Sequence, residues 1–450
     1  MSVHKHMSGY SFSLRSSSAI AAPNAVARAE AAMRATGTPL LHLSDSNPTH
    51  TGLAPASLPM RYDANPRGAL ADRRALADAI GTWWAVPAPD PEQLYLLSST
   101  SQAYSWLFKL LCDSGDVILA PAPGYPLVEQ IAALENVHVR YYRLAMHERW
   151  AIDVAHIEEL LIADRAAHCR VKAIVVINPG NPTGAYIHAD ERERLVDVCS
   201  RFSLPLIADE VFWGYPLAGT PADAASGDKA AGDAGGEQRV VTAACALRRV
   251  QLAGERRLLT FGLDGLSKNL GAPGAKVAWI YVSGPHEIVR AAQLRLDAIA
   301  DAFLPMSDII STQLPALLAE VPRQRRRVQE RCHENLALLQ KLVAADPTGV
   351  TSVITPEGGW NALVRFPATV DENALVTALI RGAGESQEVG GSAESSLAGS
   401  LAPAVTVQPG YFFDMPIPGF VNISLLLEPQ QLTAGVSALL AEIARRVQDA

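Results

Sequence analysis

Short apolar runs alternate with longer stretches in which apolar residues recur every three or four positions, from about residue 70 to 320. The short runs are apolar at consecutive positions, which is typical of strands covered on both faces. The longer stretches have the spacing of amphipathic helices. This alternation predicts an α/β fold with a mostly parallel central sheet flanked by helices and right-handed crossovers. The predicted strands are 117–120, 137–142, 173–177, 204–208, 258–261 and 277–282, and the predicted helices include 101–112, 190–202 and 285–299.

The pattern changes after residue 311, where a long helical stretch runs toward residue 344. Two strand-like runs and a closing helix follow, which predicts a smaller α+β domain. Two stretches rich in small and polar residues predict surface insertions. We expect residues 1–69 to be an N-terminal arm and part of the small domain, 70–320 the large domain, and 321–450 the C-terminal small domain. The late strands are predicted at 360–366 and 421–427, the closing helix at 431–447, and the insertions at 218–236 and 382–399.

Composition narrows the possible partners. Hydrophobic residues make up 49% of the 450 residues, enough for one large core and a smaller one. The net charge of −8 and the lack of a long basic run argue against nucleic acid. No apolar stretch approaches the roughly 18 residues of a membrane span. Residues 1–18 lack a long apolar region, so we expect a flexible arm and not a secretory signal.

Five scattered cysteines predict reduced thiols in a cytoplasmic protein. Their number is odd and their spacing is not that of metal ligands, so we expect no metal site. They are Cys112, Cys169, Cys199, Cys245 and Cys332.

Three motifs follow one another along the chain and carry the candidate chemistry. Asn181 lies in Asn178-Pro179-Gly180-Asn181-Pro182-Thr183-Gly184, Asp209 in Ala208-Asp209-Glu210, and Lys268 in Gly265-Leu266-Ser267-Lys268. Asn181 and Asp209 follow strand-like runs, so both should lie at the carboxyl edge of the sheet, where such folds bind ligands. An amide, an acid and an amine in this order can hold pyridoxal 5'-phosphate (PLP). Lys268 would form the Schiff base, Asp209 would keep the ring nitrogen protonated, and Asn181 would hydrogen-bond the ring hydroxyl.

Each of these residues also has an ordinary interpretation. A lysine after a strand is usually a solvated loop residue, a strand-end aspartate often caps a helix, and Asn-Pro elements make turns on their own account. It is the combination of the three motifs that favours the cofactor.

Further residues are candidates for binding the same cofactor. Thr100, Ser101 and Gln102 open a predicted helix, where free N–H groups and the helix dipole favour a phosphate. Such residues are also ordinary helix caps. Tyr125 follows the next strand and could stack on the pyridine ring, or could simply be a turn tyrosine.

Together these residues resemble the class I/II aminotransferases of PLP fold type I, from about residue 41 to 427 outside the two insertions. The similarity is greatest to a bacterial subgroup with Ser46-Asn47-Pro48-Thr49, the stretch 99–104 and Gly265-Leu266-Ser267-Lys268. The resemblance implies transfer of an amino group between an amino acid and a 2-oxo acid. It also implies a homodimer with shared active sites, in which Tyr62 reaches the phosphate of the neighbouring subunit. Asn47 would then be a substrate residue.

The chain departs from the family pattern at four positions. Phe212 stands where the family usually has a tyrosine that donates to the ring hydroxyl. Lys276 replaces a phosphate-binding arginine, and Gly265 replaces a phosphate-binding serine, so more would depend on Ser267 and the 100–102 segment. Asn422 stands where the family usually has the arginine that clamps the substrate carboxylate.

The missing clamp leaves two readings open. Another cation could bind the carboxylate, for which Arg365 is a candidate, although a strand arginine facing solvent is the simpler interpretation. Alternatively, the substrate differs, which keeps a PLP-dependent β-eliminating lyase acting on a sulfur amino acid as a second hypothesis. A PLP-sensing regulator is disfavoured, because the first 40 residues have no room for a DNA-binding head.

Overall fold

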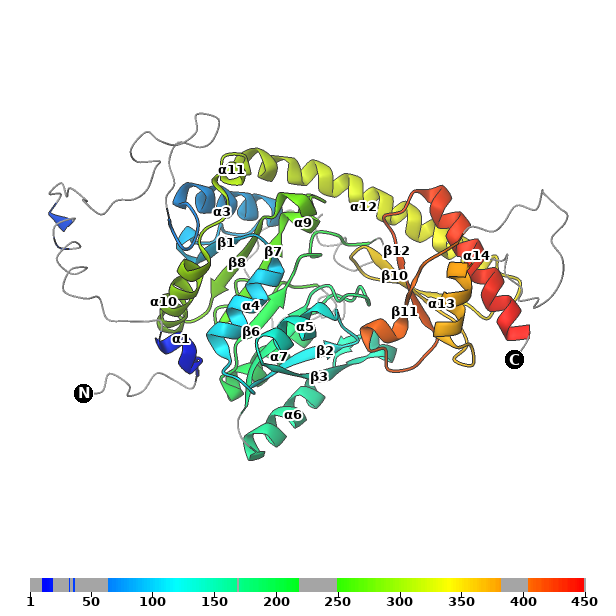
Figure 1. Cartoon of the computed structure of the whole chain (residues 1–450), viewed down its shortest axis with the longest axis horizontal. Helices are drawn as coiled ribbons and strands as arrows, with labels where there is room; N and C mark the ends of the chain where they lie inside the picture. The colour runs from blue at the N-terminus through cyan, green and yellow to red at the C-terminus, as the bar shows by residue number, and fades with distance from the viewer. Residues whose placement is uncertain are drawn as a thin grey trace, which may run out of the picture.

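A computed structural model of the chain describes residues 10–18, 32, 35–36, 64–167, 170–217, 249–381 and 404–448 (Figure 1). Two predicted site residues, Asn47 and Tyr62, lie outside the described residues. So do Cys169, Cys245 and both predicted insertions. None of the described helices is long and apolar enough to cross a membrane.

An eight-stranded sheet in the order β1-β8-β7-β6-β5-β2-β3-β4 forms the centre of the molecule. The five strands β7, β6, β5, β2 and β3 are mutually parallel, β8 is antiparallel to both β7 and β1, and β4 is antiparallel to β3. The predicted mostly parallel sheet is therefore confirmed. The strands are β1 (Leu94–Leu97), β2 (Val117–Ala122), β3 (His138–Ala145), β4 (Ala151–Ile152), β5 (Val171–Ile177), β6 (Leu206–Asp209), β7 (Thr260–Gly265) and β8 (Ala278–Ser283).

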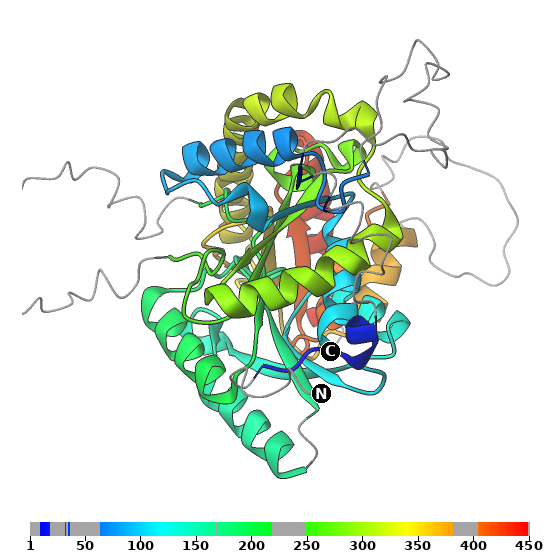
Figure 2. The same cartoon turned by 90° about the vertical axis from the view of Figure 1, so that its left-hand side faces the viewer.

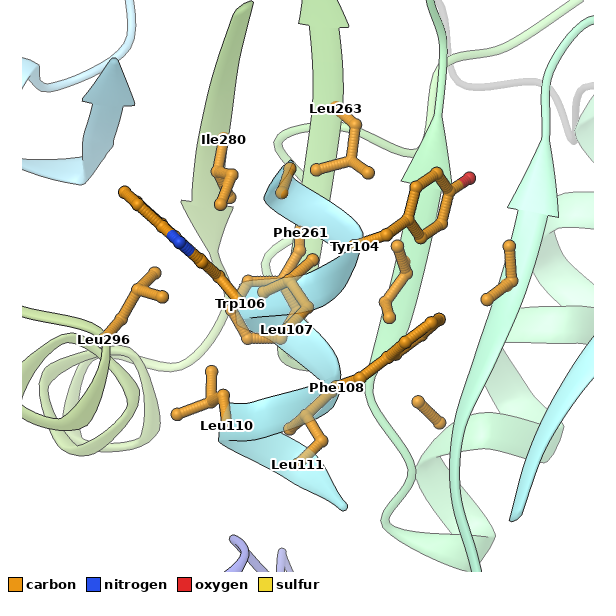
Figure 3. Close-up of a cluster of buried hydrophobic side chains, with 14 of the residues drawn as sticks. Tyr104, Trp106, Leu107, Phe108, Leu110, Leu111, Phe261, Leu263, Ile280 and Leu296 are labelled. Atoms are coloured by element: carbon orange, nitrogen blue, oxygen red, sulfur yellow. The ribbon is translucent and has the colours of Figure 1, made fainter. Parts of the chain in front are cut away.

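Helices cover both faces of this sheet, because its strands are apolar on both sides. One face packs on α4 and α10, with Trp106, Phe108 and Leu296 in the shared core (Figure 3). The other face packs on α6 and α7 through Leu161 and Leu195. The helices are α4 (Thr100–Leu111), α5 (Leu127–Leu134), α6 (Val154–Ala167), α7 (Ala189–Phe202), α9 (Leu266–Asn269) and α10 (His286–Phe303).

A second sheet of four antiparallel strands, in the order β11-β12-β10-β9, lies at the other end of the molecule (Figure 1). One of its faces packs against α12, α13 and α14 and forms a separate core with Leu339, Leu375 and Leu439. The elements are β9 (Ser352–Ile354), β10 (Asn361–Arg365), β11 (Gln408–Pro409), β12 (Phe420–Ser424), α12 (Leu314–Ala344), α13 (Glu372–Arg381) and α14 (Pro429–Gln448).

The long helix α12 connects the two sheets and contacts α3 (Leu70–Trp84) at one end and α14 at the other (Figure 1). It runs without interruption through residues 320 and 321, so the predicted division into domains stays a prediction. Figure 2 shows α10 crossing in front of the large sheet. The remaining short helices are α1 (Leu14–Ser18), α11 (Asp308–Ser311), η2 (Pro91–Gln93), η3 (Met146–Glu148), η5 (Pro273–Ala275) and η6 (Gly410–Phe413).

The described part of the expected flexible arm packs on the large sheet's helices. The Ser13 N–H donates to the Leu110 carbonyl at 3.0 Å, and the Leu14 N–H donates to the Asp113 carboxylate at 3.0 Å. Residues 10–18 thus belong with α4, while the rest of the arm up to residue 63 lies almost entirely outside the described residues.

Candidate active site

Three predicted residues meet at the carboxyl edge of the large sheet. Ile177, the last residue of β5, pairs with Asp209, the last residue of β6. Asn181 follows β5 by four residues, and Lys268 lies in α9, which begins directly after β7 ends. β1 runs in the same direction as β7, because β8 is antiparallel to both, so the N-terminus of α4 opens at the same edge. The fold therefore collects an amide, an acid, an amine and a helix N-terminus.

Asp209 is buried, with only 8% of its surface exposed. The Tyr104 hydroxyl donates to Asp209 Oδ2 at 2.9 Å, and the Val211 N–H donates to Oδ1 at 3.3 Å. Burial raises the pKa of Asp209, while these hydrogen bonds and the positive charge of Lys268 act against that rise. The carboxylate has no ion-pair partner at contact distance among the described residues.

Lys268 is half-buried between two aromatic rings. Its Nζ lies 5.1 Å from the ring centroid of Phe212 and 5.1 Å from that of Trp360. Burial lowers the pKa of Lys268, and the negative charge of Asp209 partly opposes this. The Tyr215 hydroxyl donates to the backbone carbonyl of Lys268 and so fixes the end of α9. A desolvated amine of this kind is more readily available in its neutral, nucleophilic form.

Asn181 contacts the second sheet. The Asn361 side-chain amide, at the first position of β10, donates to Asn181 Oδ1 at 3.2 Å. The Asn181 amide nitrogen is then left to donate elsewhere, as the predicted bond to a ring hydroxyl requires.

The N-terminus of α4 has the features of an anion site. The Ser99 side chain caps it by accepting from the Gln102 N–H at 3.1 Å. The side-chain oxygen of Gln102 is taken up by Ser98. Among the described residues, the N–H groups of Thr100 and Ser101 have no acceptor, as expected for the first turn of a helix. An anion here would be held mainly by the N–H groups of Thr100 and Ser101. Gln102 could add only its side-chain nitrogen, because its backbone N–H and its side-chain oxygen are already bonded.

Gly265 and Lys276 lie on either side of Lys268 in the sequence. A Cβ at Gly265 would lie 2.9 Å from the Val277 carbonyl oxygen, so a serine would not fit there without movement. Lys276 is exposed at the end of η5, and Ser267 is half-buried beside Lys268. Lys276 has no hydrogen bond or ion pair within the part of the chain that the structure describes, which leaves its charge available to an anion.

The second sheet turns one face toward these residues. Asn422 of β12 lies opposite Leu363 of β10. Leu363 packs against Trp150, which directly precedes β4 of the large sheet. Asn422 is buried, and its Nδ2 donates to Gln408 Oε1 at 3.0 Å. Its Oδ1 is buried without a partner among the described residues.

Arg365 lies on the same face of β10 as Asn361, but four residues further along. At the rise of a strand this is about 13 Å. Its side chain is exposed, and its guanidinium lies 6.0 Å from the ring centroid of Phe420. Among the described residues its one ring contact is with Phe420, and its exposure agrees with the simpler interpretation, a strand arginine facing solvent.

Tyr125 follows β2 at the same edge and is 44% exposed. Among the described residues no aromatic ring stacks on it, and its stacking on a pyridine ring stays a prediction.

Tyr104, Trp360 and Asn361 are site residues that the sequence analysis did not single out. Tyr104 lies in the apolar stripe of α4, where a hydroxyl is an exception that could have drawn attention. Trp360 and Asn361 reach the site only because the second sheet packs against the first, and no local pattern reveals that contact.

Comparisons with known proteins agree with this geometry. A model of the family described as aminotransferase class I and II matches residues 64–439. The alanine aminotransferase of Mycobacterium tuberculosis is 28% identical over 267 residues, which are 57% of this chain and 55% of that protein. The tyrosine aminotransferase of Caenorhabditis elegans is 23% identical and covers 67% of this chain and 58% of its own. The chain thus matches a little over half the length of these curated relatives.

Solved structures share the fold across nearly the whole chain. An alanine aminotransferase from Pyrococcus furiosus has a TM-score of 0.68 at 17% identity, covering 96% of this chain and 99% of that one. An aspartate aminotransferase from Thermotoga maritima has a TM-score of 0.62 at 18% identity, covering 97% and 100%. At these identities the likeness concerns the fold alone.

Proposed function

The chain belongs to the family of class I and II aminotransferases, and we propose that it is a transaminase that moves an amino group from an amino acid to a 2-oxo acid. The fold is PLP fold type I, and the cofactor of the family is pyridoxal 5'-phosphate. The observation that carries the proposal is the juxtaposition of a desolvated amine, Lys268, with a buried carboxylate, Asp209, at one sheet edge. That is the pair of groups that PLP chemistry needs.

The residues present fit the cofactor. Asp209 is a buried acid without an ion-pair partner among the described residues, which suits a protonated ring nitrogen. Thr100 and Ser101 present unpaired N–H groups at the start of α4, which suit a phosphate. Asn181 has an amide nitrogen left for the ring hydroxyl. We propose Ser267 and Lys276 as further phosphate ligands and Tyr125 as the ring that stacks on the pyridine.

Bound PLP would supply an aldehyde that links to an amine and a ring that takes up electrons from the substrate's α-carbon. Lys268 would then act as the nucleophile and as the base. Its amine makes the covalent link, and once released by the substrate it can move a proton to and from the α-carbon. The amine lies half-buried between the rings of Phe212 and Trp360, and its burial lowers its pKa.

Asp209 contributes a fixed negative charge to the same site. In a buried setting such a preorganised charge acts more strongly than it would in water. Its role is to hold a proton on the ring nitrogen throughout the reaction.

We further propose a homodimer with shared active sites. The support is the family resemblance of the segment around Tyr62, which lies outside the described residues. Light scattering on the purified protein should give twice the monomer mass. A mixture of inactive Tyr62→Phe and Lys268→Ala chains should regain activity, because one site of each hybrid is then complete.

For the cellular location we propose the cytoplasm. The support is that Cys112, Cys199 and Cys332 are buried free thiols, as is usual in a reducing compartment. Cell fractionation with a tagged chain tests this.

The activity itself is tested by mixing the purified protein, loaded with PLP, with a panel of amino acids. The panel should include alanine, aspartate and tyrosine. For a transaminase, the yellow colour converts to the pyridoxamine form, one 2-oxo acid appears per site, and no ammonia is released. Borohydride reduction followed by peptide mapping should place the pyridoxyl group on Lys268.

The same experiment separates the β-eliminating lyase hypothesis. With an S-substituted cysteine added to the panel, a lyase would release a thiol, ammonia and a 2-oxo acid in equal amounts while keeping its yellow colour. The relatives and solved structures named above are aminotransferases, which gives that hypothesis no support.

A further inference from the structure

Tyr104 connects the hydrophobic core to the candidate site. It lies in α4 and is 3% exposed, among apolar neighbours such as Phe108 and Leu107. Figure 3 shows its ring at the border of this cluster, with the hydroxyl oxygen pointing away from the apolar side chains. That hydroxyl donates to Asp209 Oδ2 at 2.9 Å, and both groups are buried. A buried hydroxyl placed for a single acceptor is costly unless the bond is made, so the contact is specific.

The Asp209 carboxylate has few other partners. The Val211 N–H reaches Oδ1 at 3.3 Å, and within the described chain no arginine, lysine or histidine hydrogen-bonds to either oxygen. Lys268 acts on Asp209 only through its charge. Tyr104 is therefore the one side chain of the described residues that fixes the rotation of this carboxylate.

We propose that Tyr104 is a positioning residue for the transaminase reaction: its hydroxyl orients the Asp209 carboxylate toward the cofactor's ring nitrogen and keeps it ionised. This inference rests on the proposed function, since it assigns Asp209 the role of partner to that nitrogen. In this role Tyr104 acts through its hydrogen bond to Asp209.

The protonation states agree with this role. Burial and the charge of Asp209 raise the pKa of Tyr104 well above its ordinary value, so the hydroxyl keeps its proton and stays a donor. Burial raises the pKa of Asp209, and the Tyr104 bond lowers it. The other titratable groups that act on this pair are Lys268, Glu210 and Tyr142. Without the hydroxyl, Asp209 should take up a proton at a higher pH.

The test compares Tyr104→Phe with a matched control. Tyr142 is also buried, at 1% exposure, and its hydroxyl donates to the Val175 carbonyl at 3.0 Å, away from Asp209. Tyr142→Phe thus removes a buried hydroxyl and its bond without touching the carboxylate. For each variant, the full chain is stripped of cofactor and titrated with PLP across a pH series, with absorbance and protein fluorescence as readouts.

We expect Tyr104→Phe to bind PLP about tenfold or more weakly, the usual size for losing a hydrogen bond to a charged group. Its affinity should also begin to fall at a higher pH on acidification than that of the parent. kcat should fall while KM for the amino acid changes little. Tyr142→Phe should lose thermal stability to a similar degree, yet keep the parent's PLP affinity and pH profile.

The double variant Tyr104→Phe/Asp209→Asn provides the second measurement. If Tyr104 acts through Asp209, the double variant should bind PLP as Asp209→Asn does. Additive losses, or a Tyr104→Phe chain with unchanged PLP affinity and pH profile, would overturn the proposal. If the parent binds PLP but transaminates no amino acid, the proposed function fails, whereas the binding comparison still decides whether Tyr104 acts on Asp209.

Discussion

The two sides of the candidate site are built differently. The large-sheet side places an acid, an amine and a helix N-terminus at strand ends, and their positions follow from a parallel sheet. The small-sheet side contributes Trp360, Asn361 and Asn422, which are neutral. Charge is thus concentrated where the cofactor would bind, and the opposite wall offers hydrogen bonds and aromatic surface.

This difference bears on how a substrate would be recognised. An arginine gives a carboxylate two hydrogen bonds and a full charge, whereas an amide gives hydrogen bonds alone. Asn422 is moreover already bonded to Gln408. Single substitutions on the cofactor side should therefore lower the catalytic rate strongly. Substitutions on the small-sheet side should change the affinity for substrate and cofactor more than the rate.

The largest expected effect is on the cofactor side. Lys268→Ala should lower kcat by about 10²- to 10⁴-fold, the usual contribution of a general acid–base group, and abolish the yellow lysine-linked form. Small primary amines added to the solution should restore part of the rate. Single-turnover absorbance measurements with the best amino acid of the panel check this.

Lys276→Ala is the matched control for that experiment. It removes a lysine eight residues away that is exposed and that we assign to the phosphate. PLP affinity should fall, while kcat at saturating PLP stays near that of the parent. Equal losses of kcat in both variants would contradict the assignment of Lys268 as the reacting amine.

A smaller effect is expected from the contact that joins the two sides. Asn361→Asp keeps the size of the side chain but removes the donor to Asn181 Oδ1. The Asn181 amide should then turn its nitrogen toward the new carboxylate and away from the ring hydroxyl. We expect PLP affinity to fall about tenfold, which corresponds to one hydrogen bond. Titration of the stripped chain measures this, and Asn373→Asp, on the surface of α13, serves as a comparison.

The same contrast explains how much the sequence could predict. Asp209 ends a strand, and Asn181 and Lys268 each follow one within four residues, so local pattern and strand direction were enough to place them at one sheet edge. The mostly parallel sheet could also be predicted from local pattern, because strands covered on both faces have apolar residues at consecutive positions.

The small-sheet side could not be predicted in this way. Asn361 meets Asn181 across 180 residues of chain, and Asn422 lies opposite Leu363 only through strand register. Arg365 is a candidate from its charge alone, and the sequence does not show that its side chain is exposed beside Phe420. The hydroxyl of Tyr104 is an exception in the apolar stripe of α4, but the sequence does not show that Asp209 accepts from it, 105 residues away.

Phe212 allows a finer test of the cofactor side. Its ring lies 5.1 Å from Lys268 Nζ and carries no hydroxyl that could donate to the ring oxygen of PLP. In Phe212→Tyr the added donor should stabilise the deprotonated form of the Lys268–cofactor linkage, so the pKa of that linkage should fall relative to the parent. A spectral pH titration reads this pKa directly. An unchanged or higher pKa in Phe212→Tyr would contradict the expected geometry.

The smallest effect is expected at Arg365. Its guanidinium is exposed over Phe420, about 13 Å along the strand from Asn361, and charges at that separation in water are largely screened. Arg365→Ala should therefore leave KM for amino acids within about twofold of the parent, since exposed side chains contribute little. Asn422→Ala, by contrast, removes a buried amide bonded to Gln408 and should change KM more. Steady-state kinetics on both variants decides the point: a KM that rises tenfold in Arg365→Ala alone would mean that β10 moves this arginine to the substrate, and that the small-sheet side does supply a charge.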